Sequence, residues 1–94
     1  MILDDVKLSL RISNTAYDTE IQDLILQAKA DLELCGVSDI KIIDSDALIK
    51  RAIITYCKAN FGFDNPDAER LQKSYDMLKM HLTLAEDYIT EVVV

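Results

Sequence analysis

The sequence contains few of the residues that interrupt a helix. Glycine occurs twice and proline once in 94 residues, and tryptophan is absent. An all-β fold needs many turns, which glycine and proline usually supply, so this scarcity argues against a sandwich or a barrel. Leucine, isoleucine, alanine, lysine and the acidic residues dominate instead, and most of these favour helices. We therefore predict a mainly α-helical protein that forms a single domain over residues 1–94.

Basic residues and long apolar runs are also scarce. Lys and Arg number 10 against 17 Asp and Glu, which gives a formal net charge of −7. Tight binding to a nucleic-acid backbone needs many basic contacts, so the composition argues against specific nucleic-acid binding. No apolar run approaches the length of a membrane span, and the acidic start "MILDDVK" is unlike a secretory signal. The sequence predicts a protein that is made and kept in the cytosol, with no membrane partner.

Side chains that commonly carry catalysis or bind metal are few. His81 is the one histidine, and no Cys or Ser lies at a local spacing typical of a catalytic triad. Cys35 and Cys57 form no C-x-x-C motif, so we interpret both as small buried apolar residues. The acidic stretches 44–46 and 64–69 lack the glycine and spacing of a calcium loop, and helix capping explains them. We predict no enzyme, no catalytic residue, no metal site and no cofactor.

Apolar residues recur at helical spacing in four stretches, each with an inward stripe of residues three or four positions apart. The stripes are Leu3, Val6 and Leu10; Ile21, Leu24, Ile25, Ala28, Leu32 and Cys35; Leu48, Ile49, Ala52, Ile53, Tyr56 and Cys57; and Leu71, Tyr75, Leu78, Leu82 and Ala85. Ile54 adds apolar surface outside the third stripe, so the third helix should be the most buried. The pattern predicts a small bundle of about four helices.

Capping residues set the expected boundaries of these helices. The predicted N-caps are Thr15 or Asp18 for the second helix, Asp44 or Ser45 for the third and Asn65 for the fourth. Gly36 fits the C′ position that ends the second helix, and Gly62 allows the third to stop. Pro66 should occupy the first position of the fourth helix, where its missing N–H costs nothing. We expect that helix to fray near residues 83–86.

Two segments do not fit a helix. Residues 37–43 read as a loop or a short extended segment between the second and third helices, and the β-branched end, Tyr88 to Val94, reads as an extended, strand-like tail. A lone strand leaves its backbone groups unpaired, so the tail should pair with another element or chain. The alternatives are a tail that folds back on its own bundle and a tail that stays disordered until a partner arrives. The residues predicted to form an assembly interface are Val37, Ile40, Ile42, Ile43, Tyr88, Ile89, Val92, Val93 and Val94.

The order and spacing of these segments resemble the small head-tail connector family of tailed phages. A short opening motif is followed by a long helix, a buried helix that ends near the aromatic pair Phe61 and Phe63, and a last helix. The matching residues are Leu3, Val6, Lys7, Leu10, Arg11 and Ile12; Glu20, Ile21, Leu24, Ile25, Ala28 and Lys29; and Ser74, Tyr75, Leu78, Lys79 and Leu82. The resemblance spans nearly the whole chain.

This resemblance implies an adaptor made in the cytoplasm of a bacterial host and built into the virion at the head–tail interface. Such a protein forms a homo-oligomeric ring below the portal protein, extends the DNA channel and docks a stopper or tail-completion protein, with residues 86–94 as an assembly arm. DNA would only pass through the channel, and an acidic wall would not hold it. The alternative is an acidic phage-encoded inhibitor that mimics DNA and binds a host nuclease or regulator. Acids and bases interleave on the fourth helix, which is unlike a contiguous DNA-mimicking face.

Overall fold

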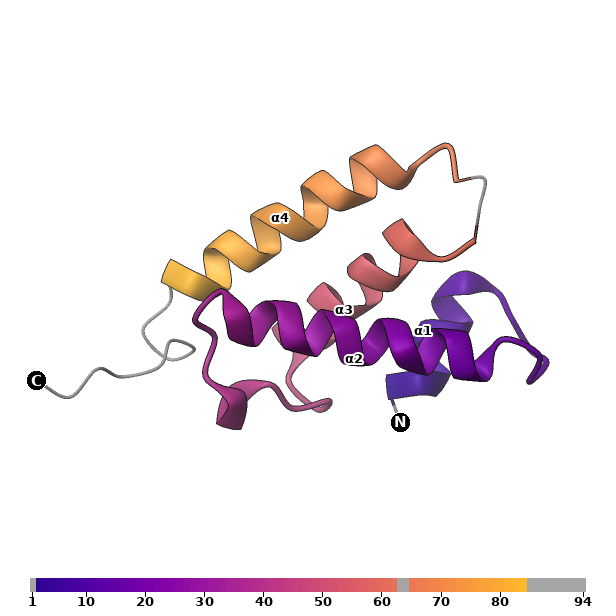
Figure 1. Ribbon diagram of the computed structural model, residues 1–94, viewed down its shortest axis with the longest axis horizontal. Helices are drawn as coiled ribbons and strands as arrows, with labels where there is room; N and C mark the ends of the chain where they lie inside the picture. Colours follow the sequence, from indigo (N-terminus) through magenta and orange to yellow (C-terminus); the bar gives the residue numbers. More distant parts are fainter. Residues whose placement is uncertain (1, 63–64, 85–94) are drawn as a thin grey trace, which may run out of the picture.

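A computed structural model of the chain describes residues 2–62 and 65–84. Their regular structure consists of α1 (Ile2–Leu10), α2 (Asp18–Leu34), the short 3-10 helix η1 (Asp39–Lys41), α3 (Ala47–Asn60) and α4 (Ala68–Leu84). Figure 1 shows α3 between α2 and α4, running in the direction opposite to both, with α1 packed across one end. The mainly helical fold and the four predicted helices are confirmed. The predicted loop between the second and third helices contains η1.

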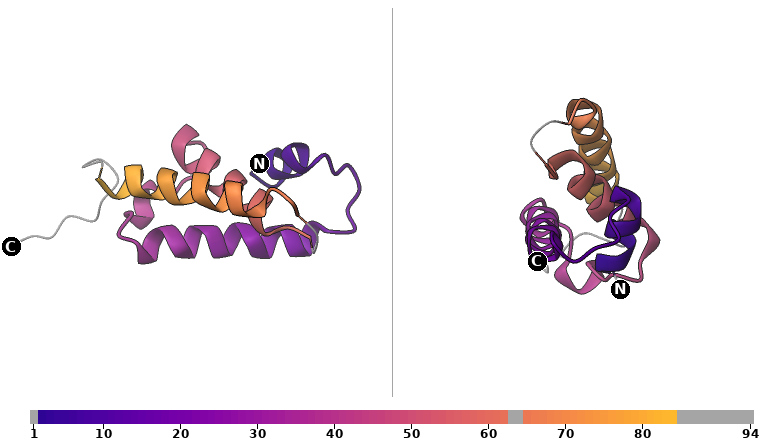
Figure 2. Two further views of the ribbon diagram at one scale, coloured as in Figure 1. Left: turned by 90° about the horizontal axis from the view of Figure 1, so that it is seen from above. Right: turned by 90° about the vertical axis from the view of Figure 1, so that its right-hand side faces the viewer.

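The core lies where α1, α2 and α3 meet, and α4 covers α3 from the outside (Figure 2). Its completely buried side chains include Val6 of α1, Ile21 and Leu32 of α2, and Ile49 and Ile53 of α3. These residues belong to the stripes predicted from spacing, with α3 the most buried helix. Burying one aliphatic side chain of this size stabilises a fold by about 1.5–3 kcal/mol, so these contacts supply most of the driving force.

Backbone geometry explains where the first two helices end. Arg11 has φ 59°, and the N–H of Ile12 donates to the carbonyl of Lys7 at 2.9 Å, which closes α1. Gly36 closes α2 in the same way, with φ 104° and a bond from the Val37 N–H to the Leu32 carbonyl at 3.1 Å. This six-to-one bond across a left-handed residue is the Schellman motif. The predicted C′ role of Gly36 is therefore confirmed, and α1 uses an arginine where glycine is usual.

The start of α2 differs from the prediction. Tyr17 occupies the N-cap position and makes no side-chain capping bond, so neither Thr15 nor Asp18 is the cap. Asp18 is instead the first helical residue, and its carboxylate forms an ion pair with Lys7 of α1 at 2.7 Å. An acidic side chain in the first turn still interacts favourably with the positive, N-terminal end of the helix dipole. The Tyr17 ring packs edge-on against Phe61 at a centroid distance of 5.5 Å, which joins this turn to the end of α3.

The start of α3 also corrects the prediction. Its N-cap is Asp46, whose Oδ1 accepts the N–H groups of Leu48 and Ile49 at 2.9 and 3.1 Å, whereas Asp44 and Ser45 precede the cap. Asp44 instead pairs with Lys29 of α2 at 2.8 Å. Leu48, which was predicted to face inward, is the second residue of the helix and is half exposed.

The turn between α3 and α4 is organised by Asn65. Its Nδ2 donates to the Lys58 carbonyl at 2.7 Å, and its Oδ1 accepts the Asp67 N–H at 3.0 Å. The first helical bond of α4 runs from the Leu71 N–H to the Asp67 carbonyl, so the helix begins after Asp67. Pro66 therefore lies in the turn and not at the first helical position that was predicted for it. The helix continues to Leu84, and the rest of the region expected to fray lies outside the described residues.

Candidate functional site

The predicted assembly residues divide into three groups. Val37 is completely buried, because the Gly36 turn directs it back onto the core, and it presents nothing to a partner. Ile42 is partly buried and packs against the same core. Ile40 and Ile43 are exposed, at 76% and 49% of their surface, because η1 carries them away from the body. The tail residues Tyr88, Ile89, Val92, Val93 and Val94 lie outside the described residues.

The cysteines also differ from one another. Cys57 is buried in the core, and burial raises its thiol pKa to about 12, which keeps it protonated and unreactive. Cys35 is exposed, so its predicted burial was wrong. It follows the last residue of α2, where the chain turns toward Gly36 and the inward stripe no longer applies. Within the described ranges, no three His, Cys, Asp or Glu side chains are grouped so that they could hold a metal ion.

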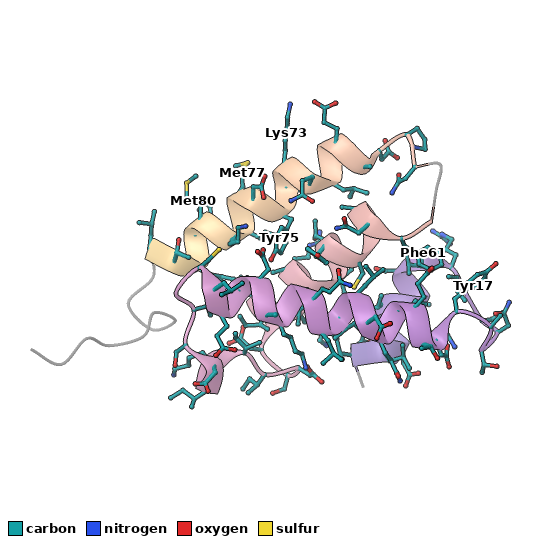
Figure 3. The ribbon with its side chains drawn as sticks, viewed as in Figure 1. Tyr17, Phe61, Lys73, Tyr75, Met77 and Met80 are labelled. Atoms are coloured by element: carbon teal, nitrogen blue, oxygen red, sulfur yellow. The ribbon has the colours of Figure 1, made fainter. Side chains whose placement is uncertain are left out.

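One carboxylate links α4 to α2. Asp31 of α2 accepts a hydrogen bond from the Tyr75 hydroxyl at 2.6 Å and another from Lys79 Nζ at 3.1 Å. Figure 3 shows Tyr75 beneath α4, directed toward α2, whereas Lys73 and Met80 point away from the body. Tyr75 is completely buried, and its ring packs edge-on against Tyr56 of α3 at 5.1 Å. A single tyrosine thus fixes α4 against both of its neighbours.

The charges of this link reinforce one another. Burial alone would raise the Asp31 pKa, but the hydrogen bonds from Tyr75 and Lys79 and the lysine charge outweigh it and hold the pKa below its ordinary value. Burial would lower the Lys79 pKa, and the bond and charge of Asp31 raise it instead. Burial and the Asp31 bond both raise the Tyr75 pKa. At neutral pH the link therefore contains a carboxylate, an ammonium and a neutral phenol.

A pocket of about 420 Å³ lies between α3 and α4. Its lining residues recur every three or four positions, so each helix contributes one face. They are Arg51, Ile54, Thr55 and Lys58 of α3, and Arg70, Leu71, Ser74, Met77, Leu78 and His81 of α4. The lining combines charged and polar side chains with the apolar side chains of Ile54, Leu71, Met77 and Leu78. The pocket is a concave site that a ligand can reach.

The charge of this pocket is opposite to that of the protein. Its lining contains Arg51, Lys58, Arg70 and His81, and no Asp or Glu is among the lining residues of the described chain. Most other lysines face carboxylates, including Lys7, Lys29, Lys50, Lys73 and Lys79. Within the described residues, Arg70 is the one pocket cation with an ion pair, a solvent-exposed contact to Asp67 at 3.7 Å. The pocket is therefore a basic site on an acidic molecule.

Sequence reasoning missed this pocket because no local motif marks it. The spacing of Arg51 and Lys58, seven residues apart on a buried helix, places two cations on one face and is the signal that could have indicated it. Arg70 and His81 join them only through the packing of α4 on α3.

Comparison with known protein families identifies a match for this chain. The chain matches the sequence model of a family described as phage connector protein over residues 2–89. No curated protein and no solved structure matches the chain significantly. The match begins at the first residue of α1 and extends past the last residue of α4, so it includes both helices that line the basic pocket. None of the described helices is long and apolar enough to cross a membrane.

Proposed function

Because the chain belongs to the phage connector protein family, we propose that it forms a ring below the portal, extends the DNA channel and docks a stopper or tail-completion protein. The family is structural, and membership implies a connector-type role as a component of the virion. The match over residues 2–89 is the observation that carries the proposal. The partners that we propose are the portal protein, further copies of this chain and the next protein toward the tail.

The shape and the charge of the molecule support this role. A ring requires two different surfaces on each copy that bind each other, and the rotation between copies must close. The α3–α4 pocket and the exposed apolar residues Ile40 and Ile43 near η1 are separate surfaces, so the described chain presents more than one surface to other copies and to neighbouring virion proteins. A net charge of −7 suits a channel through which DNA must slide, because a basic wall would retain it.

The acidic inhibitor remains the alternative interpretation, and the geometry gives it less support. A DNA mimic presents unpaired carboxylates on one face. Here Asp5, Asp18, Asp31, Asp44 and Glu69 each face a lysine. These pairs involve residues of all four helices, so cations lie beside many of the carboxylates.

The connector role is tested by electron microscopy of lysates from a phage or prophage that lacks this gene. We expect separate tails beside heads that have packaged or lost their DNA, because portal assembly precedes the connector. Restoring the gene should restore joined virions. Joined virions in the absence of the gene would reject the role, and affinity capture of a host nuclease or regulator would then support the inhibitor.

A further inference from the structure

Assembly of this chain into a ring, on which the following inference rests, brings copies of net charge −7 together. Like charges at an interface repel, and such a contact becomes favourable only where opposite charges are placed opposite one another. The α3–α4 pocket is a basic surface that can meet an acidic one. The acidic surface must come from another part of the neighbouring copy.

Residues 85–94 have the matching chemistry in their sequence. This segment, "AEDYITEVVV", contains Glu86, Asp87 and Glu91 and no Lys or Arg, together with tyrosine, isoleucine and three valines. Its acids suit the cations of the pocket, and its apolar residues suit the apolar lining residues, among them Ile54 and Leu71. No other stretch of ten residues in the chain combines acids without any base with so many β-branched residues.

We propose that the α3–α4 pocket binds residues 85–94 of a second copy of this chain, with Arg51, Lys58 and Arg70 facing the acidic side chains. The apolar side chains of the segment cover Ile54 and Leu71. The pocket and the segment are different surfaces of the same chain, so the contact is heterologous, which is the kind that propagates around a ring. The β-branched segment then has a partner outside its own helices.

The same charges argue against the other occupants. A nucleic-acid strand would meet three cations in the pocket. The rest of the molecule is acidic and would repel a polyanion. The chain's own segment follows Leu84, one turn beyond His81, so it is the competing occupant. Binding within one chain joins no copies, and the two arrangements give different results when variants are mixed.

The test reverses charge on each side of the contact in the full-length chain. The pocket variant carries Arg51→Glu and Arg70→Glu, both near helix N-termini where acidic side chains are tolerated. The tail variant carries Glu86→Lys and Asp87→Lys and alters no described residue, so it tests the contact even if the pocket variant does not fold. A control with Arg11→Glu and Lys73→Glu has the same charge change as the pocket variant at exposed positions outside the pocket. Circular-dichroism melts establish that each variant is folded.

Sedimentation velocity over a range of concentrations measures association. We expect the wild type and the control to associate, and each reversed variant to associate at least about tenfold more weakly, because like charges then meet. An equimolar mixture of the pocket and tail variants should regain association. In the mixture, each acidic pocket meets a lysine-bearing segment, and each basic pocket meets an acidic one.

Four results would overturn the proposal. They are wild-type chains that stay monomeric, reversed variants that associate normally, a mixture that stays dissociated, and association that nuclease treatment abolishes. A chain that carries all four reversals distinguishes the two arrangements. Binding within one chain would be restored in that chain but not in the mixture, whereas binding between copies would be restored in both. If gene deletion still separates heads from tails in these cases, the connector role stands and only the assignment of the pocket fails.

Discussion

The α1–α3 body and α4 are held in place by different forces. The body is closed by aliphatic side chains from three helices, including Val6, Ile21, Leu32 and Ile53, all of which are completely buried. Among the buried core residues of the described chain, α4 contributes Tyr75 and Leu82. The partly buried Leu78 of α4 packs against the same core, and the carboxylate link at Asp31 ties the helix to α2.

This difference separates stability from function. Apolar burial is non-directional and large, so the body can fold around its own core. A polar link with exact partners sets the position of α4 more than it adds stability, because the net contribution of a hydrogen bond is only about 1 kcal/mol. Since α4 forms one wall of the basic pocket, the position of this helix determines the shape of the pocket.

The largest expected effect is in the body. Replacing Ile53 with alanine leaves a cavity among α1, α2 and α3, and we expect a loss of about 2–5 kcal/mol in the free energy of unfolding. Leu34→Ala is the control, because Leu34 is 86% exposed and its change should stay within about 0.5 kcal/mol. Urea denaturation measures both. Equal effects of the two substitutions would show that the core is not where the structure places it.

The link that positions α4 should respond in a different way. Tyr75→Phe keeps the buried ring and removes only the hydroxyl that donates to Asp31, so we expect a loss of about 1–2 kcal/mol. Amide hydrogen exchange should increase in α4 and much less in α1 and α2. A uniform increase over all helices would show that α4 and the body unfold as one unit, which removes the distinction between them.

The N-cap of α3 provides a further test, because α3 contacts both the rest of the body and α4. Asp46→Ala removes the side chain that accepts the Leu48 and Ile49 N–H groups, and we expect a loss of about 1 kcal/mol. Ser45→Ala, at one of the two positions that the sequence predicted for the cap, should change the melting temperature little. The reverse order of effects would support the predicted cap and contradict the observed one.

Acid should weaken the attachment of α4. The Asp31 pKa is lowered below 3.8 in the folded protein, so its stabilising contribution is complete above that value and is lost as the pH falls through the folded pKa. Lys79 and Tyr75, whose pKa values are raised, lose their contributions at the alkaline end. Asp31→Asn should reduce stability at neutral pH, with a difference from wild type that shrinks as the solution is acidified. A constant difference would contradict the link.

Spacing predicted the body better than it predicted the pocket. Apolar periodicity identifies the buried faces of Ile21, Leu32 and Ile53, because a helix has a fixed repeat. Periodicity does not identify the first residue of a helix. Three consecutive residues that can act as an N-cap precede α3, and the folded structure uses Asp46. Val37 was misread because its burial depends on the Gly36 turn and not on a stripe.

Long-range contacts account for the rest of what the sequence did not predict. The Asp31 carboxylate meets Tyr75 and Lys79 from 44 and 48 positions further along the chain, and no local pattern encodes that distance. The pocket also depends on long-range packing, because its cations come from two helices and meet only when α4 packs on α3. Arg51 and Arg70 are exposed and do not belong to the apolar stripes, so the pattern that identifies the core gives no information about them.

Electron microscopy of lysates from the gene-deleted phage, complemented with pocket variants, tests the central claim most directly. The chain with Arg51→Glu and Arg70→Glu is compared with the charge-matched control that carries Arg11→Glu and Lys73→Glu. We predict separate heads and tails with the pocket variant and joined virions with the control. Joined virions in normal number with a folded pocket variant would contradict the claim that the α3–α4 pocket is the surface on which this connector protein assembles.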